Sequence, residues 1–539
     1  MKRNSEEYFL QKPVIEFDYK STIAHSNPFF DVVLDVVFVH KESGEEWVLP
    51  AFWRGRNRWS VRFYAPRSGP YQARSVCSMA EDEGLHHQVH SFIVPESAYI
   101  HPLYRHGKLG IDVRNKFVYQ DGTDFFWLGD TWWMALSDRL KFPEDFETLL
   151  RDRKQKGFTV IQLVAGLFPD MDAFDERGSN EAGFPWEKDF GTINPAYFDE
   201  ADKRIEAIVD AGLTPFIFGA WGYYLSKMGE EKMRRHWRYL IARWSAYPVL
   251  WSMAGEVSMP WYLSEDREGD HHRLRTSWSR IGTYIKEIEP YGRLLSAHPV
   301  HRAHLELDDT EMLDFEMLQT GHGDLESVRN TIGTIAAAKE EIRDKPIVLS
   351  EVTYEGILGQ NDAAIQRLVF WIAILSGIDG FTYGVNGIWQ VNGDQTPFGD
   401  SPNGSNWGDT PWREAMSLPG SRQIALAKRL LEEYDWQHLE PMSHALSHHG
   451  DASDLSAPFC AGIAERLRIV YCFEGGYLYR LGRIRMSGLK TSSIYRIFIH
   501  DATTGGKIVE QRVSTDRRGI LKLPRKRFPC DWIMILHMD

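Results

Sequence analysis

Two glutamates that each end a short apolar run are the side chains of this sequence best placed for bond cleavage. Glu256 ends the run VLWSMAGE, and Glu351 ends the run PIVLSE. Cleavage of a glycosidic bond needs one protonated carboxyl group, which donates to the leaving oxygen, and one ionised carboxylate, which attacks the anomeric carbon or activates water. If the two runs are strands four and seven of a (β/α)8 barrel, their carboxyl ends meet at its mouth. The pair therefore predicts a glycoside hydrolase.

The separation of the two carboxyl groups would decide the stereochemistry. About 5 to 5.5 Å implies retention through a covalent intermediate, and about 6.5 to 9.5 Å implies inversion by a trapped water. Glu355, close behind Glu351 in SEVTYEG, is the chief competitor for the second catalytic role, and Asp130 is another. For each of these carboxylates, a structural ion pair or a solvated loop acid is the alternative interpretation.

Polar and aromatic side chains also follow the other apolar runs. Sugars present faces of C–H bonds and rims of hydroxyl groups, so sugar sites combine flat aromatic platforms with carboxylates and amides. Most of the 19 tryptophans nevertheless belong to a large core. The predicted substrate-binding residues are Asp130, Trp132, Trp133, Trp221, His298, Gln319, His322, Tyr354, Glu355, Tyr383, Asn386 and Trp389.

Two further groupings of polar residues are assigned no ligand. His298, His301 and His304 recur at a spacing of three, but a zinc site also needs a defined helix and a fourth ligand. The acidic segment around Asp170 and Asp172 lacks the spacing of a calcium loop and is interpreted as a solvated loop. We expect neither a metal ion nor a cofactor.

The elements that would position these side chains follow from the hydrophobic pattern. Between about residue 117 and residue 442, short apolar runs alternate with segments of helical period, which is typical of repeated βα units. Helix-start prolines and helix-end glycines, such as Pro143 with Gly157 and Pro195 with Gly212, support these helices. The predicted strands are 125–130, 159–166, 214–222, 249–256, 293–299, 312–318, 346–351 and 380–385.

The two ends of the chain show a different pattern. Residues from about 10 to 97, and those after the helical stretch that ends near Trp436, contain closely spaced alternating runs without helical segments between them. Such runs predict antiparallel β-sandwiches. The fold class is therefore α/β, a (β/α)8 TIM barrel (99–442) between an N-terminal β-sandwich (1–98) and a C-terminal β-sandwich (443–539).

Composition excludes several classes of partner. The formal charge of −13 comes from 75 acidic and 62 basic residues without long blocks of one sign, so neither nucleic acid nor a membrane surface is expected. The first residues lack the apolar core of a signal peptide, and no apolar run is long enough to span a membrane. Four scattered cysteines fit a reducing compartment, so we expect a cytoplasmic protein. Self-association through either sandwich is left open.

The order of several motifs resembles the apiosidase-like catalytic family of glycoside hydrolases. The motifs are KFVYQDGTDFFWLGDTWW, GEVS, SEVTYEG, GFTYGVNGIW and PWREAMSLPGSRQ followed by PM, and they span roughly residues 100 to 442. The segment FVHKESGEEWVLPAFWRGRNRWSVRFYAPRSGPYQ is similar to the sandwich that precedes such barrels. The resemblance implies a barrel enzyme that acts on plant-type or bacterial oligosaccharides or polysaccharides.

Carried over to this sequence, the resemblance implies that Glu256 is the general acid/base and Glu351 the nucleophile. One departure concerns the residue before Glu256, because retaining enzymes of the larger clan usually carry Asn there and this chain has Gly255. Retention is favoured but less secure for that reason. A barrel that binds carbohydrate without cleaving it, and a metal-dependent hydrolase on the same barrel, remain the alternatives.

Overall fold

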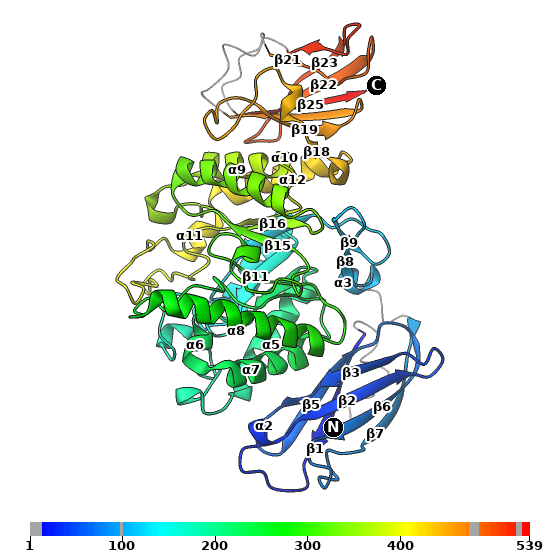
Figure 1. Ribbon diagram of the computed structural model, residues 1–539, viewed down its shortest axis with the longest axis vertical. Coiled ribbons are helices and arrows are strands. Elements are labelled where there is room, and N and C mark those ends of the chain that lie inside the picture. The colour runs from blue at the N-terminus through cyan, green and yellow to red at the C-terminus, as the bar shows by residue number, and fades with distance from the viewer. Residues whose placement is uncertain (1–12, 97–100, 474–483, 524–530, 539) are drawn as a thin grey trace.

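The chain folds into three parts that follow one another along its long axis (Figure 1). The computed structural model describes residues 13–96, 101–473, 484–523 and 531–538. An N-terminal sandwich lies at one end, a barrel in the middle and a C-terminal group of sheets at the other end. The predicted α/β class and the predicted barrel between antiparallel sheets are confirmed. The limits near residues 98 and 442 stay predictions.

The centre of the molecule is an eight-stranded parallel sheet in the order β14-β13-β12-β11-β10-β17-β16-β15. All eight predicted strands are confirmed. Between β14 and β15 no strand ladder is recorded, and Asp314 N donates to Leu295 O at 2.8 Å there. The strands are β10 (Trp127–Thr131), β11 (Val160–Val164), β12 (Thr214–Phe218), β13 (Leu250–Ser252), β14 (Leu295–Ser296), β15 (Glu316–Gln319), β16 (Ile347–Glu351) and β17 (Gly380–Tyr383).

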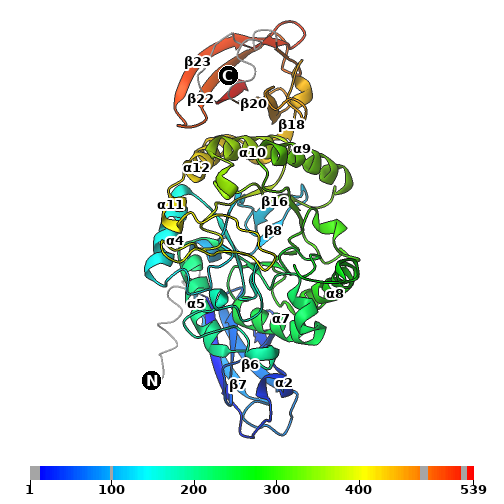
Figure 2. The same ribbon diagram turned by 90° about the vertical axis from the view of Figure 1, so that its left-hand side faces the viewer.

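Helices surround these strands (Figure 2). Pro195 and Gly157 lie at helix ends as predicted: Pro195 opens its helix, where the Asn194 side chain accepts from Ala196 N, and Gly157 ends its helix at φ 84°. Only the 3-10 turn Ala303–Leu305 separates β14 from β15, where the helical pattern of the sequence is weak. The helices are α4 (Glu144–Lys156), α5 (Pro195–Asp210), α6 (Tyr224–Met228), α7 (Glu230–Trp244), α8 (Arg267–Ile288), α9 (Asp324–Glu341), α10 (Ala363–Leu375), α11 (Trp412–Met416) and α12 (Pro419–Glu432).

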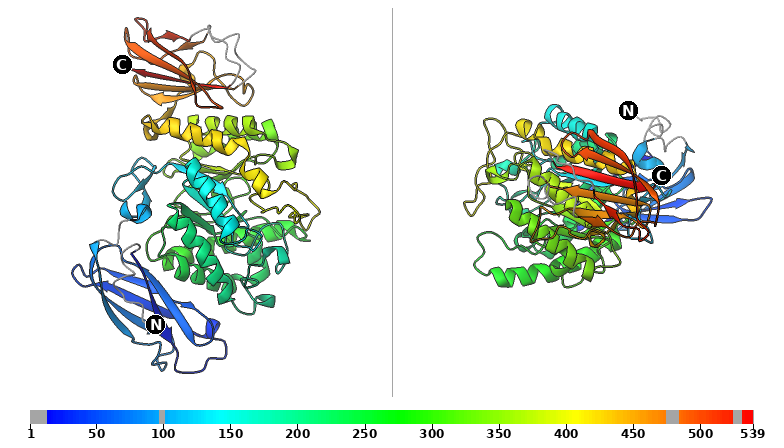
Figure 3. Two further views of the ribbon diagram at one scale, coloured as in Figure 1. Left: turned by 180° about the vertical axis from the view of Figure 1, so that it is seen from behind. Right: turned by 90° about the horizontal axis from the view of Figure 1, so that it is seen from above.

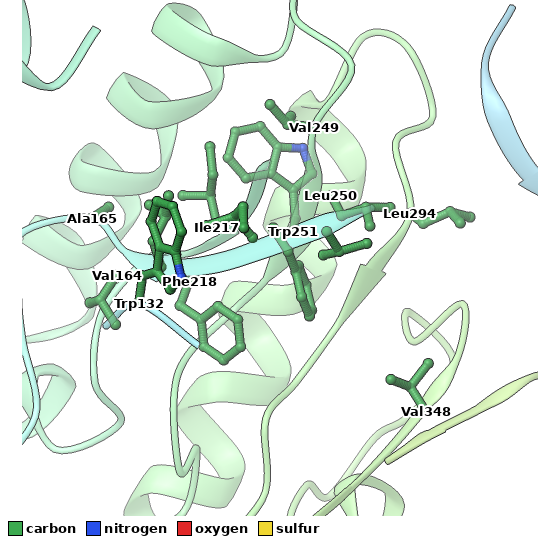
Figure 4. Close-up of a cluster of buried hydrophobic side chains, with 14 of the residues drawn as sticks. Trp132, Val164, Ala165, Ile217, Phe218, Val249, Leu250, Trp251, Leu294 and Val348 are labelled. Carbon is green, nitrogen blue, oxygen red and sulfur yellow. The ribbon is translucent and has the colours of Figure 1, made fainter. Parts of the chain in front are cut away.

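Large apolar side chains fill the space between strands and helices (Figure 4). Trp251 and Phe218 are fully buried, and Trp127 meets Phe216 edge-on inside the barrel with ring centroids 5.3 Å apart. Aromatic burial on this scale leaves the short strands little freedom to shift. The packed interior therefore fixes where the carboxyl end of each strand lies.

The N-terminal part is a sandwich of two antiparallel sheets, β1-β5-β4 and β3-β2-β6-β7. Phe38 of one sheet stacks on Phe63 of the other with ring centroids 4.0 Å apart. The strands are β1 (Val14–Lys20), β2 (Leu34–His40), β3 (Glu46–Pro50), β4 (Phe52–Trp53), β5 (Arg58–Tyr64), β6 (Gly69–Cys77) and β7 (Val89–Val94), with the short helix α2 (Pro28–Asp31). The segment α3 (Pro102–Arg105) and the hairpin β8 (Leu109–Ile111) and β9 (Phe117–Tyr119) then run along the barrel (Figure 3).

The C-terminal part is a six-stranded antiparallel sheet with a two-stranded sheet beside it. Trp371 of α10 stacks on Tyr471 at a centroid distance of 5.8 Å, which seats this sheet on the barrel helices. The larger sheet holds β18 (Glu440–Pro441), β19 (Phe459–Ile463), β20 (Leu467–Cys472), β25 (Trp532–Met538), β22 (Ile494–Asp501) and β23 (Lys507–Ser514), and the smaller β21 (Arg485–Met486) and β24 (Leu521–Lys522). None of the helices in the described ranges is long and apolar enough to cross a membrane.

A buried ion-pair cluster joins the N-terminal sandwich to the barrel. Arg62 of β5 lies 2.5 Å from Asp202 of α5, and Arg243 of α7 lies 2.6 Å from the same carboxylate. Trp244 Nε1 also donates to Asp202 at 2.7 Å. Burial opposes ionisation of Asp202, but the two guanidinium groups outweigh burial and lower its pKa. The cluster therefore holds one carboxylate ionised between two parts of the chain.

We expect Asp202→Asn to destabilise the protein by about 3–5 kcal/mol, because two buried guanidinium groups lose their shared anion. The matched control is Asp199→Asn, one turn earlier on α5, whose side chain is 44% exposed and pairs with Arg243; its expected loss is below about 1 kcal/mol. Urea unfolding followed by tryptophan fluorescence measures both. A loss no greater for Asp202→Asn than for the control would contradict this role.

Candidate active site

Glu256 and Glu351 lie at the carboxyl-terminal mouth of the barrel, as predicted. Glu351 is the last residue of β16, and Glu256 follows β13 on a backbone turn with φ 42°. The two carboxyl groups interact directly, because the charge of Glu351 contributes to raising the pKa of Glu256. The structure therefore brings together the pair that the sequence singles out.

Glu256 is a carboxyl group that favours its protonated form. Gln319 Nε2 donates to its Oε1 at 3.2 Å, and Trp221 Nε1 donates to its Oε2 at 3.1 Å. Burial, followed by the charge of Glu351, raises its pKa to about 8 despite these two donors. The residue as a whole is partly exposed. At neutral pH Glu256 thus holds a proton and can still be reached.

Glu351 has the opposite environment. His298 Nε2 lies 3.2 Å from one of its carboxylate oxygens, and His322 Nε2 lies 3.0 Å from the other. Burial opposes ionisation of this 5% exposed residue, but the two imidazoles outweigh burial and lower its pKa to about 2. Two carboxyl groups in one site are therefore divided into an acid and an anion, which is the division that glycosidic cleavage needs.

His298 connects the two glutamates. The backbone N–H of Glu256 donates to His298 Nδ1 at 3.4 Å. Because Nδ1 then accepts, the neutral ring carries its proton on Nε2, the atom that faces Glu351. The fully buried ring also packs edge-on against Trp133 at 5.7 Å. Its orientation is therefore fixed by packing and by the backbone of the acid.

The packing of Trp221 explains why glycine stands before Glu256. A Cβ atom on Gly255 would lie 2.3 Å from the Trp221 ring, which is far too close for two carbon atoms. The Trp221 indole therefore fills the space of a side chain at position 255, and its N–H reaches Glu256 instead. The departure at Gly255 is thus coupled to the presence of Trp221.

Several other predicted binding residues surround the pair. Trp133 meets Trp221 edge-on at 5.4 Å, and Tyr354 lies 4.7 Å from His322 and 6.4 Å from Trp389 between ring centroids. Many polar atoms here are buried without a hydrogen-bond partner among the described residues. They are Gln319 Oε1, His322 Nδ1, Asn386 Oδ1 and Trp389 Nε1. Since buried polar groups are normally paired, this concentration is typical of a site that takes a polar ligand.

Asp130 and Trp132 lie on the outer face of the barrel. Asp130 is fully buried, 2.6 Å from Arg153 of α4, and accepts from Trp132 Nε1 at 2.6 Å. Side chains alternate along a strand, so residues 130 and 132 share one face while Trp133 points to the other. Asp130 is thus bound by Arg153 and Trp132 between the barrel strands and the outer helices.

Glu355 and Tyr383 form a second structural pair. Tyr383 Oη donates to Glu355 at 2.5 Å, and the backbone N–H of Gly420, at the start of α12, donates to the same carboxylate at 3.0 Å. A carboxylate at a helix N-terminus is a stabilising arrangement. Glu355 therefore ties α12 to the barrel, and its carboxylate is occupied by these structural contacts.

Three residues that were not predicted for the site interact with its charges or rings: Asp170, Tyr262 and Trp407. The solvated-loop interpretation is wrong for Asp170, which is 7% exposed, whereas the Asp172 side chain is 64% exposed. The available signal was position, since Asp170 follows the apolar run VIQLVAGLF directly after Pro169. Within the described ranges, no three His, Cys, Asp or Glu side chains are grouped so as to hold a metal ion.

Comparisons with known proteins agree with this architecture. Residues 112–438, more than half of the chain, match the family described as apiosidase-like, catalytic domain. Residues 11–77 match a domain of unknown function, DUF5060. No curated relative matches the chain.

Solved structures of glycoside hydrolases share the fold. A glycoside hydrolase family 5 protein from Bacteroides vulgatus is 19% identical, with a TM-score of 0.65, over 81% of this chain and 94% of that chain. A proposed glycoside hydrolase from the same species is 18% identical, with a TM-score of 0.66, over 98% and 99%. Another glycoside hydrolase is 20% identical, with a TM-score of 0.64, over 81% and 98%. At these identities the likeness establishes the fold.

We expect Gly255→Ala to destabilise the protein by about 1–3 kcal/mol, because the new methyl group must displace the Trp221 ring. The same substitution at Gly333, in the middle of α9 with open space at its Cβ position, is expected to stabilise by about 0.5–1 kcal/mol. Urea unfolding measures both, and near-ultraviolet circular dichroism reports the movement of the indole. Equal effects at the two positions would show that Trp221 does not require a glycine.

Proposed function

The chain belongs to the apiosidase-like family of catalytic domains, and we propose that it is a retaining glycosidase with Glu256 as acid/base and Glu351 as nucleophile. Family membership makes the chain a glycosidase with a carbohydrate substrate, as the motifs implied. The observation that carries the assignment of roles is the pair of imidazoles, His298 and His322, which contact Glu351 and leave Glu256 protonated.

In the first step, a carboxylate oxygen of Glu351 attacks the anomeric carbon while the glycosidic C–O bond breaks. Glu256 gives its proton to the leaving oxygen, so the departing sugar leaves as an alcohol. The products are a glycosyl ester on Glu351 and an ionised Glu256. The donors Trp221 and Gln319, which favour the ionised form of Glu256, stabilise it at this point.

In the second step, Glu256 takes a proton from water, and the oxygen of that water attacks the anomeric carbon. The ester bond to Glu351 breaks, and Glu351 departs as a carboxylate. His298 and His322 face the two oxygens that recover this charge. Preorganised donors of this kind lower the barrier without reorganising during the reaction.

One hydrogen bond and one charge interaction support retention over inversion. Gln319 lies opposite Glu351 in the register of β15 and β16, yet its amide donates to Glu256. One glutamine side chain therefore spans the gap between the two carboxyl groups, and their direct charge interaction points the same way. The separation of about 5 to 5.5 Å that retention requires would leave no space for the trapped water of an inverting enzyme.

The proposed substrates are plant-type or bacterial oligosaccharides or polysaccharides, on the family likeness. We place the protein in the cytoplasm, where imported oligosaccharides would be the substrates. The buried free thiols of Cys77, Cys460 and Cys472 support a reducing compartment; Cys530 lies outside the described residues.

We expect Glu351→Gln and Glu256→Gln to fail in different ways on 2,4-dinitrophenyl glycosides and natural oligosaccharides. Loss of the nucleophile abolishes cleavage of both classes by several orders of magnitude. Loss of the acid lowers oligosaccharide cleavage by about 10²–10⁴-fold, but spares formation of the glycosyl-enzyme from the activated substrate, whose leaving group needs no proton. The assays are steady-state and burst kinetics.

Glu355→Gln is the matched control, since it makes the same change four residues beyond Glu351. We expect it to reduce stability while kcat falls less than about tenfold. Proton NMR of the first-formed anomer tests retention directly. Full activity of Glu351→Gln, or inversion at the anomeric carbon, would overturn the assignment, and sugar binding without cleavage by the native protein would favour the non-catalytic alternative.

The pH dependence of kcat/KM tests the acid role of Glu256 independently. Glu256 must be protonated to act as the acid, so kcat/KM is expected to fall as the pH rises through about 8. Trp221→Phe removes an N–H that favours the ionised form of Glu256, so its pKa rises further and the basic limb moves to higher pH. Trp261→Phe, a nearby ring without that contact, serves as the control. A limb that stays in place or moves to lower pH in Trp221→Phe contradicts the prediction.

A further inference from the structure

A third buried carboxylate, Asp170, lies beside the two glutamates. It sits in the loop after β11 with φ 55° and is 7% exposed. Charge interactions link it to both partners: its charge contributes to raising the pKa of Glu256, and that of Glu351 contributes to raising the pKa of Asp170. The three acids therefore share one space at the mouth of the barrel.

Asp170 differs from the other acids of its loop in having no cation. Asp172 lies 2.8 Å from Lys227, and Asp175 lies 2.7 Å from Arg177. Among the described residues, no lysine, arginine or histidine lies within ion-pair distance of Asp170, although it is the most buried of the three. Burial of a carboxylate without a cation costs free energy, and such groups are concentrated in functional sites.

The loop around Asp170 is anchored on both sides. Tyr223 Oη donates to Phe168 O at 2.8 Å and to Met171 O at 3.0 Å, which fixes the backbone on either side of the aspartate. Arg177 donates to Phe398 O at 3.0 Å and so joins this loop to the one that carries Trp407. Asp170 is therefore held in position and not mobile at a loop tip.

Trp407 links Asp170 to the nucleophile. Its ring lies 6.1 Å from that of His322, whose Nε2 is 3.0 Å from Glu351. The side chains of Tyr262, Ser401 and Trp407 favour the ionised form of Asp170, although burial outweighs them. The Trp407 indole N–H is itself buried without a hydrogen-bond partner among the described residues. A carboxylate acceptor and a buried indole N–H thus lie on the side of the site where His322 contacts Glu351.

Four aromatic side chains around the pair are almost completely buried. Trp133 is 2% exposed, Tyr354 is 2% exposed, and Trp221 and Trp389 are each 4% exposed. An enzyme that cuts within a polymer stacks successive sugar units on exposed aromatic platforms along a cleft. Burial of these rings instead favours a site that closes around one sugar unit.

We propose that Asp170, with the Trp407 indole, binds neighbouring hydroxyl groups of a neutral sugar at the end of a chain, so that the enzyme is exo-acting. This inference rests on the proposed glycosidase function and adds the class of sugar. Asp170 accepts hydrogen bonds from two hydroxyls, and Trp407 donates to the oxygen of one of them. The negative charge shared by Asp170 and Glu351 repels a uronic acid at the same place.

The test uses a panel of 4-nitrophenyl glycosides of neutral pentoses and hexoses together with 4-nitrophenyl glucuronide and galacturonide. We expect the native protein to cleave one or more neutral glycosides and neither uronide. On the best neutral glycoside, Asp170→Asn should lower kcat/KM by about tenfold to a hundredfold, mainly through KM, because charge-assisted hydrogen bonds to hydroxyls are lost. Trp407→Phe keeps the ring but not the N–H and should give a smaller loss.

Asp172→Asn is the matched control, because it removes an exposed carboxylate two residues away and should leave kcat/KM within about twofold. A second measurement separates binding from folding. Removal of the Asp170 charge should move the basic limb of kcat/KM to lower pH, since that charge helps to hold the pKa of Glu256 high. A loss of folding alone would lower active-enzyme concentration and leave both KM and the pH limb unchanged.

Product analysis tests exo action. With an oligosaccharide that the native protein cleaves, only the terminal monosaccharide should appear early in the reaction. Asp170→Asn with unchanged KM and unchanged pH limb, cleavage of a uronide, or early release of internal fragments would overturn the inference while leaving the roles of Glu256 and Glu351 intact. Absence of all cleavage by the native protein would instead count against the proposed function itself.

Discussion

The site depends on the fact that two buried carboxyl groups close together cannot both ionise at neutral pH. The protein resolves this conflict by placing both nearby imidazoles, His298 and His322, on Glu351. Glu256 receives only neutral donors, from Trp221 and Gln319, and keeps its proton. The unequal distribution of imidazoles and neutral donors thus makes one carboxyl group an acid and the other an anion. The strands and loops that carry these side chains must therefore be held in place.

The barrel supplies that positioning from strands that are far apart in the sequence. Glu256 follows β13, His298 follows β14, Gln319 ends β15 and Glu351 ends β16, so four consecutive strands carry the central network. The ladder is open between β14 and β15, and this is where the network crosses from the acid to the nucleophile. Hydrogen bonds from residues beside the strands cross this gap: Asp314 N donates to Leu295 O at 2.8 Å, and Ser296 Oγ donates to Phe315 O at 2.7 Å. The ion-pair cluster at Asp202 then fixes the outer helices against the N-terminal sandwich.

Much of this could be predicted from the sequence because it depends on periodicity. Eight apolar runs, helix-end glycines and acids directly after strands are local signals, and they located the barrel and both glutamates. The contacts that a side chain makes at a strand end depend on other elements of the fold, and a local sequence pattern does not show them. Asp130 is paired with Arg153 of α4, and Glu355 with the start of α12, so the role of each acid depends on a contact with a helix that the strand pattern does not show. Asp170 was missed because its burial arises from the loops of Tyr262 and Trp407, which no pattern around residue 170 reveals.

The Gly255 position shows how a change in one residue is absorbed by another. A side chain at this position would clash with the Trp221 ring, so the indole and the glycine form one unit. Trp221 also donates a hydrogen bond to Glu256, which Phe or Leu at position 221 could not do. Any hydrogen bond that a residue at 255 would make to the sugar must then come from elsewhere in the site. Asp170 has no cationic partner among the described residues, Tyr262, Ser401 and Trp407 lie around it, and Arg177 joins its loop to the loop that carries Trp407. In the binding that we propose, recognition of the sugar lies on the loops and not at the strand end, so a small change in a loop sequence would alter the sugar accepted without disturbing the two glutamates.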